Sequence, residues 1–214
     1  PQRREHETVT FRELWFFVIP VSTTGVMFAL SRPILFAFVA RTPDGIATIA
    51  ALRVAFDFSM IFQQAANQFR HFFISFGFDD LPSKRRFMIF VGAGITAMML
   101  AFSLTPLHSL LWGSLMGLPP QLLSLSRDAT LIMCLMPTII IYRNYFHSHL
   151  MMARQTSGMA YGSIVRVIGI YACAQILFSL GWLDHVAATF TLILGFVIEA
   201  IIAKMSIRRA ALLN

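Results

Sequence analysis

Charged residues are scarce in this sequence, since Asp, Glu, Lys and Arg together make up only 13% of its 214 residues. A soluble domain carries roughly 25%. Hydrophobic residues make up 57% of the chain, and the mean hydropathy is +0.71. In a chain of 24.1 kDa, so few charged residues cannot cover the surface of a water-soluble globular protein. The composition therefore excludes an ordinary soluble protein and predicts one that is embedded in a membrane.

Cysteine and the common catalytic motifs are scarce as well. Cys134 and Cys173 each stand alone in an apolar run, so their spacing indicates neither a disulfide framework nor a zinc site. The sequence has no P-loop, HExxH or GxSxG motif, and no GxGxxG motif after a strand. We therefore expect no enzymatic activity, no metal site and no cofactor.

Positive charge is present in excess, with a net charge of +7 and a pI of about 10.3. In a soluble chain this excess would indicate a nucleic-acid partner. Here the cations lie at the ends of apolar segments or inside them. We therefore expect the anionic partners to be lipid headgroups or a transported small anion, and we expect no nucleic acid.

Apolar runs of about 20 residues, separated by Pro, Gly and clustered charge, predict membrane-spanning helices. The six expected ranges are 11–40, 44–76, 85–105, 122–154, 158–182 and 185–206. The predicted fold class is therefore all-α, a polytopic bundle of six transmembrane helices. It comprises a lobe at 11–206, an N-terminal segment at 1–10 and a C-terminal tail at 207–214.

Proline sets several details of this prediction. The stretch 106–121 is bracketed by prolines and is too short to cross a bilayer, so we expect an interfacial or re-entrant segment there. Pro20, Pro33 and Pro137 lie inside predicted helices, where each removes a backbone donor. Each is expected to bend its helix and to free a carbonyl group for another partner.

The distribution of cations over the predicted loops is strongly uneven. One side holds only Arg41 and Arg127. The other side holds ten cations: Arg3, Arg4, Arg12, Lys84, Arg85, Arg86, Arg154, Lys204, Arg208 and Arg209. Because positive charge accumulates on the cytoplasmic side of membrane proteins, this bias predicts that both termini are cytoplasmic. The expected location is the plasma or inner membrane.

Further charged residues lie at or within the apolar helices. The acids are Asp57 and Glu199, and the cations are Arg32, Arg53, Arg70, Arg143 and Arg166. An arginine or aspartate at the bilayer centre costs roughly 2.5–3.5 kcal/mol on insertion scales, so each is expected to face a partner or a hydrated cavity. The cations exceed the acids by three, which favours a cavity that attracts anions.

The range 44–76 carries a polar stripe. At 100° per residue, Arg53, Asp57, Gln64, Gln68 and His71 fall within about 60° of one another, with Asn67 close beside them. Arg53 and Asp57 are four residues apart and are expected to form an ion pair. The stripe either lines a hydrated cavity or holds this helix to its neighbours through hydrogen bonds.

The later helices carry a weaker pattern of the same kind. Arg143, His147 and Arg154 fall within about 40° on the range 122–154. Arg166 is expected either to contact substrate or to reach the lipid headgroups. Glu199 is expected either to carry a coupling proton or to pair with a neighbouring arginine. The pair Gly158 and Gly162 indicates close helix packing.

Several of these positions resemble a known family. The distinctive region includes Phe16, Phe17, Pro20, Ser31, Arg32, Pro33, Ile34, Phe38, Val39, Ala40 and Arg41. Looser matches are Arg70, Arg143, Leu150, Met151, Ser163 and Arg166. This pattern is similar to the start of the second half of progressive ankylosis type transporters. They belong to the multidrug/oligosaccharidyl-lipid/polysaccharide flippase superfamily, which also contains the MATE exporters.

The resemblance implies a MATE-like lobe, one of two six-helix lobes between which substrate moves by alternating access. It implies export of anions such as pyrophosphate, nucleotide or citrate, or of lipid-linked sugars or drugs. Arg32, Arg41, Arg70, Arg143 and Arg166 are the matching arginines. The second lobe is expected in the same polypeptide, the chain being its carboxyl half with residues 1–10 as the inter-lobe linker, or in a homodimer.

The leading hypothesis is a transporter lobe that exports or flips an anionic solute or lipid-linked headgroup. The residues expected to bind substrate are Arg32, Arg53, Asp57, Gln64, Asn67, Gln68, Arg143 and Arg166, with Glu199 as the coupling residue. The alternative hypothesis is a non-transporting structural or assembly subunit of a membrane complex, in which the polar stripe docks a partner. A third hypothesis is an enzyme that acts on lipid pyrophosphates.

Overall fold

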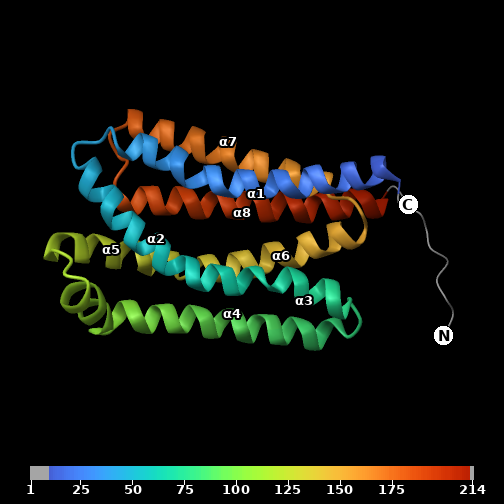
Figure 1. Ribbon diagram of the computed structural model, residues 1–214, viewed down its shortest axis with the longest axis horizontal. Helices are drawn as coiled ribbons and strands as arrows, with labels where there is room; N and C mark the ends of the chain where they lie inside the picture. The colour runs from blue at the N-terminus through green and yellow to red at the C-terminus, as the bar shows by residue number, and fades with distance from the viewer. Residues whose placement is uncertain (1–9, 213–214) are drawn as a thin grey trace.

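The computed structural model describes residues 10–212, and it describes side chains as far as Ile207. The described chain is helical throughout, with short turns between the helices (Figure 1). The helices are α1 Phe11–Val39, α2 Gly45–Asn67, α3 Phe69–Phe76, α4 Leu81–Leu104, η1 Ser109–Leu115, α5 Pro120–Met133, α6 Met136–Met152, α7 Ser157–Ser179 and α8 His185–Leu212. The predicted all-α class is therefore confirmed.

Within residues 10–212, six helical segments are long and apolar enough to cross a membrane, as predicted. Four of them are single helices, α1, α4, α7 and α8. The other two each consist of two helices that are separated by a short break, α2 with α3 and α5 with α6. The chain is therefore a multi-pass integral membrane protein. The predicted tail begins inside α8, which continues past residue 206 to Leu212, while residues 1–9 and 213–214 lie outside the described part.

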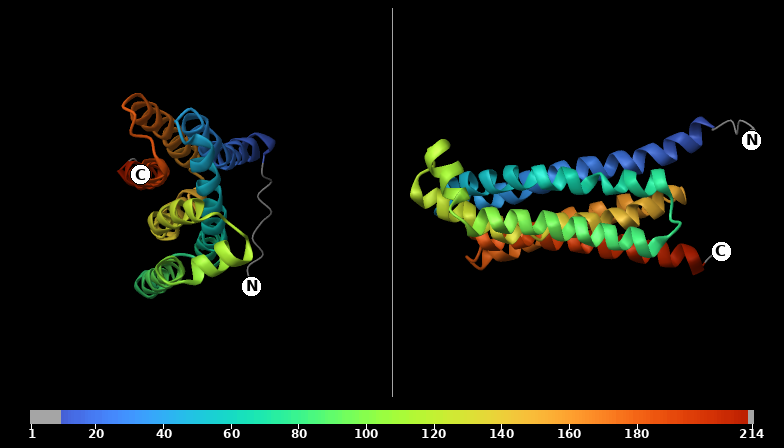
Figure 2. Two further views of the ribbon diagram at one scale, coloured as in Figure 1. Left: turned by 90° about the vertical axis from the view of Figure 1, so that its left-hand side faces the viewer. Right: turned by 90° about the horizontal axis from the view of Figure 1, so that it is seen from below.

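The spans form one elongated bundle with α4 at one edge. Helices α1, α7 and α8 pack together on one side, and the α2–α3 and α5–α6 spans lie between them and α4 (Figures 1 and 2). The N-terminal end of α1 leans away from the bundle in the right-hand view of Figure 2. Its side chains are accordingly exposed, as Phe11, Trp15 and Phe16 illustrate.

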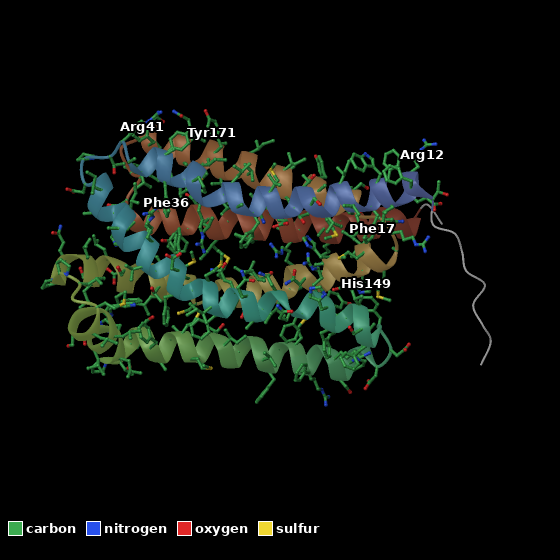
Figure 3. The ribbon with its side chains drawn as sticks, in the orientation of Figure 1. Arg12, Phe17, Phe36, Arg41, His149 and Tyr171 are labelled. Atoms are coloured by element: carbon green, nitrogen blue, oxygen red, sulfur yellow. The ribbon has the colours of Figure 1, made fainter. Side chains whose placement is uncertain are left out.

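The ends of the bundle carry different numbers of cations. Arg12, Lys84, Arg154 and Lys204 lie near the end at which α1 begins and α8 finishes. Arg41 lies at the opposite end, and Figure 3 shows Arg12 and Arg41 far apart. The assignment of the cation-rich end to the cytoplasm is a prediction from this bias.

The prolines at which bends were predicted differ in their surroundings. Pro137 lies in the first turn of α6, directly after the break at Cys134 and Leu135. The carbonyl of Cys134 accepts a hydrogen bond from the Thr96 hydroxyl at 3.1 Å, so α4 supplies a partner at this break. In contrast, α1 continues as one helix through Pro20 and Pro33. Of the two spans in which a proline bend was predicted, only the one with Pro137 has a helix break beside the proline.

Small residues bring α7 and α8 close together. A Cβ atom added to Gly162 would lie 3.4 Å from the backbone oxygen of Glu199 on α8. One added to Gly195 would lie 2.7 Å from Cγ1 of Ile170 and 3.0 Å from Cγ of Arg166 on α7. These glycines let the two backbones approach, and the approach places Arg166 beside Glu199.

The substitution Gly195→Ala is expected to lower the free energy of unfolding by about 1–3 kcal/mol, because the added methyl group overlaps Ile170. The matched control is Gly94→Ala on α4, where an added Cβ meets nothing within 4 Å. Thermal unfolding in detergent compares the two variants. Equal melting temperatures would contradict the close packing of α7 on α8.

Candidate functional site

Glu199 of α8 lies at the centre of a buried polar cluster, with 1% of the residue exposed. Its Oε2 atom accepts hydrogen bonds from Arg143 of α6, at 3.2 Å, and from Arg166 of α7. Its Oε1 atom accepts a hydrogen bond from the hydroxyl of Ser163, at 2.6 Å. One carboxylate therefore joins three helices, and it is shared by two guanidinium groups.

Two asparagines extend this cluster to α2. Arg143 donates from Nη2 to Oδ1 of Asn67 at 3.0 Å and to Oδ1 of Asn144 at 3.4 Å. Asn144 donates from Nδ2 to Oδ1 of Asn67, at 3.2 Å, and to the carbonyl of Ala66, at 3.2 Å. The orientation of Arg143 is therefore fixed by partners on α2, α6 and α8.

Aromatic rings cover the other faces of both guanidinium groups. The Phe196 ring lies 5.3 Å from Cζ of Arg143 and 4.6 Å from Cζ of Arg166. The Phe28 ring lies 5.8 Å from Cζ of Arg166. These contacts stabilise the two buried cations. They leave the cavity side of Arg143 as the direction from which a ligand can approach.

A cavity of about 250 Å³ adjoins the cluster. It lies between α1, α2, α3, α6 and α8, and most of its lining is polar. The lining residues are Thr24, Gly25, Phe28, Gln64, Asn67, Gln68, Arg70, His71, Arg143, His147 and Glu199. Amide, hydroxyl, imidazole and guanidinium groups are all hydrogen-bond donors. The cavity therefore presents the donor-only guanidinium groups of Arg70 and Arg143, several groups that can donate or accept, and a single carboxylate.

The charges around this cavity do not balance. Arg70, Arg143 and Arg166 supply three guanidinium groups, whereas Glu199 is the one carboxylate of the cluster within residues 10–207. Among the described side chains, no carboxylate pairs with Arg70. The buried Nε atom of Arg70 also has no hydrogen-bond acceptor within the described residues. Two positive charges are therefore left without a counter-charge in the described structure.

His147 is the second titratable neighbour of Glu199. Its Nε2 atom lies 3.7 Å from Oε1 of Glu199, and 2% of the residue is exposed. Within the described residues, this nitrogen has no hydrogen-bond partner. The imidazole therefore lies beside the carboxylate without forming a hydrogen bond to it.

The cluster lies close to the middle of the membrane-spanning region. Arg143 and Arg166, which both contact Glu199, are each nine residues from the ends of their spans, at Met152 and Ser157 respectively. At 1.5 Å per residue, these separations are about 14 Å. The hydrocarbon core is about 30 Å thick, so three helices bring the charged groups near its midplane.

The predicted site residues fall into two groups. Gln64, Asn67, Gln68, Arg143 and Glu199 line the cavity, and Arg166 lies behind Glu199 in the cluster. Arg32, Arg53 and Asp57 lie outside it, farther along α1 and α2. The stripe predicted on 44–76 therefore contributes to the cavity only through its C-terminal half.

The predicted ion pair of Arg53 with Asp57 is wrong. Among the described residues, Asp57 pairs with Arg32 of α1, and 3.4 Å separates Nη1 from Oδ1. Arg32 also donates to the carbonyl of Phe56, at 3.3 Å, and lies over the Phe56 ring. Arg32 therefore contacts both Asp57 and Phe56 from the neighbouring helix. Arg53 remains exposed.

The predicted face of Arg143, His147 and Arg154 is only partly present. His147 lines the cavity with Arg143, but α6 ends at Met152, and Arg154 lies in the following turn with a φ of 55°. The helical periodicity on which the prediction rested stops before Arg154. This arginine therefore belongs to the end of the bundle rather than to the central cluster.

Sequence reasoning did not select Asn144, and it included Ser163 only as a loose family match. Both contact the charged cluster. Ser163 lies three residues before Arg166, which places the two on one helical face, so helical spacing gave a usable signal. Asn144 is adjacent to Arg143 in sequence and contacts α2 only through tertiary packing.

Comparisons of the chain with protein-family models, with curated proteins and with solved structures gave no match. The class that the fold defines is that of a six-span integral membrane protein with a buried arginine–glutamate cluster.

Proposed function

We propose that this chain is one lobe of a membrane transporter that moves an anionic solute or lipid headgroup by alternating access. The observation that carries the proposal is the charge imbalance at the central cavity, where Arg143 and Arg166 share Glu199 and Arg70 has no carboxylate partner among the described side chains. Guanidinium groups match carboxylate and phosphate in two-point contacts. Buried charge near the bilayer centre is costly and marks ion or substrate pathways.

In the proposed mechanism, Glu199 forms ion pairs with Arg143 and Arg166 when no anion is bound. An anion that enters the cavity meets Arg70 first, because Arg70 has no carboxylate partner in the described structure. It then competes with Glu199 for Arg143, while Gln64 and Gln68 donate neutral hydrogen bonds. His147 is placed to take up or supply a proton as Glu199 loses its partner. Release of the anion restores the ion pair.

The proposal includes a second six-helix lobe, in the same polypeptide or in a second copy of the chain. Arg53, Asp57, Gln64, Gln68 and His71 are exposed on the surface of the α2–α3 span. A charged and polar face at membrane depth needs water or protein against it, because lipid cannot satisfy its hydrogen bonds. The resemblance to the flippase superfamily supports the same arrangement, with the cavity between two lobes.

The test of the cavity is thiol accessibility. A Gln64→Cys variant, in a background lacking Cys134 and Cys173, is expected to react with a membrane-impermeant thiol reagent in proteoliposomes. The control is Phe90→Cys on the outer face of α4, where the native side chain is 78% exposed and is expected to contact lipid. Equal and negligible labelling at both positions would contradict a hydrated cavity.

The same exposed face of α2 favours one rival, a structural subunit of a membrane complex. In that role the polar side chains would be covered by a fixed partner, and Gln64→Cys would stay unlabelled in the purified complex. Purification in native lipid separates the two proposals. A partner of constant stoichiometry bound over α2, without anion flux, supports the subunit, whereas flux by the purified chain supports the transporter.

A further inference from the structure

One face of the α2–α3 span carries polar side chains that have no partner inside the lobe. Arg53, Gln64 and Gln68 are exposed, and within residues 10–207 their side chains form no hydrogen bond or ion pair. The span has 32 residues, a length of about 48 Å, so about six residues at each end exceed the hydrocarbon core of about 30 Å. Arg53 and Gln68 are each eight residues from an end of the span. All three side chains therefore lie at the depth of the core, where lipid cannot satisfy them.

These side chains belong to a continuous row of exposed residues on α2. The α2 row comprises Arg53, Asp57, Ile61, Gln64 and Gln68. Its members are three or four residues apart and fall within about 80° of one another, which is the spacing of a helix that packs against another helix along its length. Ile61, at the middle of the row, is 68% exposed. Asp57 pairs with Arg32, but the Asp57 side chain remains 77% exposed.

The central cavity opens on the same face. Gln64 and Gln68 of its lining are exposed, and so is Gly25, which lines it from α1. A Cβ atom added to Gly25 would meet nothing within 4 Å. Ser22 and Ala29 lie three and four residues from Gly25 and are also small and exposed. Small residues at this spacing let another helix approach closely. Within residues 10–207, the lobe therefore leaves the cavity open on the side of the α2 row.

We propose that a second copy of this chain covers this face, with the α2 rows of the two copies facing each other across a twofold axis along the membrane normal. This inference rests on the proposed function, whose second lobe it identifies. The charges of the α2 row complement themselves, because Arg53 of one copy meets Asp57 of the other and the twofold axis repeats the pair. The two residues are offset by one helical turn, about 6 Å, which an extended arginine side chain spans. Both copies carry the same positive-inside bias, so both have the same orientation.

The proposed contact divides the α2 row into two parts. Arg53 and Asp57 lie nearer the start of α2, and with Ile61 they close the interface between the copies. Gln64 and Gln68 lie nearer the charged cluster and line the cavity. The second copy supplies the wall that the cavity lacks on this side, and the same contact completes the cavity of the second copy.

Self-association of the purified chain in liposomes tests this proposal. Energy transfer between chains labelled with donor and acceptor dyes is measured at decreasing protein-to-lipid ratios. Arg53→Asp and Asp57→Arg are each expected to weaken self-association at least tenfold, because like charges then meet across the axis. The double variant exchanges the two charges and restores the pairs, so its association is expected to approach that of the wild type. Asp79→Arg, in the exposed turn before α4, is the matched control and is expected to have no effect.

Cross-linking provides a second readout that does not depend on these charges. Ile61→Cys, in a background lacking Cys134 and Cys173, is expected to form a disulfide-linked dimer on oxidation, whereas Phe90→Cys on the outer face of α4 is not. A wild-type chain that stays monomeric at every ratio, or single charge reversals without effect, would overturn the proposal. So would a double variant that has the wild-type melting temperature but does not regain association. Anion flux from a monomeric chain would overturn the second copy while supporting transport. Association without flux would support the second copy and contradict transport.

Discussion

Replacing Arg143 by Gln is expected to reduce anion flux through the reconstituted protein by about thirtyfold or more. Arg143 lines the cavity and is held by Glu199 and Asn67. Loss of one partner from a buried charge pair costs about 2–5 kcal/mol of interaction, and each 1.4 kcal/mol is tenfold. The measurement is uptake of radiolabelled phosphate, pyrophosphate and citrate into proteoliposomes.

This variant is expected to fold, because Glu199 keeps its contacts with Arg166 and Ser163. Arg143→Lys retains the charge but loses the two-point contacts, so an intermediate flux is expected. The matched control is Arg127→Gln, since Arg127 of α5 bonds the carbonyl of Ser103 outside the cavity. Wild-type flux in Arg143→Gln, or an equal loss in Arg127→Gln, would contradict the role of Arg143. Wild-type flux no greater than that of empty liposomes would contradict transport itself.

Replacing Glu199 by Ala is expected to lower the free energy of unfolding by about 3–5 kcal/mol. The substitution leaves Arg143 and Arg166 buried without their shared counter-charge. Asp57→Asn is the matched control, because it also breaks an arginine–carboxylate pair, but the Asp57 side chain is 77% exposed. That change is expected to cost less than about 1 kcal/mol. Thermal unfolding in detergent measures both effects.

An anion is expected to restore part of the lost stability. Glu199→Gln keeps the size of the side chain and an oxygen that can accept from Ser163, but removes the charge. If the arginines form an anion site, sulfate or phosphate replaces the missing carboxylate and raises the melting temperature of Glu199→Gln more than that of the wild type. An equal effect of the salt on both proteins would argue against an anion site at this cluster.

The number of spans was predictable because it depends on the length and hydropathy of the apolar runs. The breaks inside two of the spans were harder to predict, because they depend on tertiary contacts. The prolines at 119 and 120 indicated where α5 begins, and Pro137 indicated a bend in the same span. No proline or glycine marks the break at Gln68. There the carbonyl of Ala66 accepts a hydrogen bond from Asn144, a residue of another helix.

The cavity was predictable only in part, for a related reason. Helical periodicity correctly grouped Gln64 and Gln68 on one face, since that grouping depends on a single helix. It could not identify the partner of Asp57, because Arg32 arrives from α1. Nor could it place Arg166 beside Glu199, since that contact depends on how closely the glycines let α7 and α8 approach.

The break at Gln68 lies next to the charged cluster, and in the proposed transport cycle it would serve as a pivot. Beyond it, α3 is tied to α6 by the Ser148 hydroxyl, which donates to the carbonyl of Arg70 at 3.1 Å. Before it, α2 packs mainly against α5. A tilt of α3 and α6 as one body would therefore carry Arg70 and Arg143 away from α2 without opening the backbone ladder of any helix. In the proposed transport cycle, this tilt would move the two cations together from one side of the membrane towards the other.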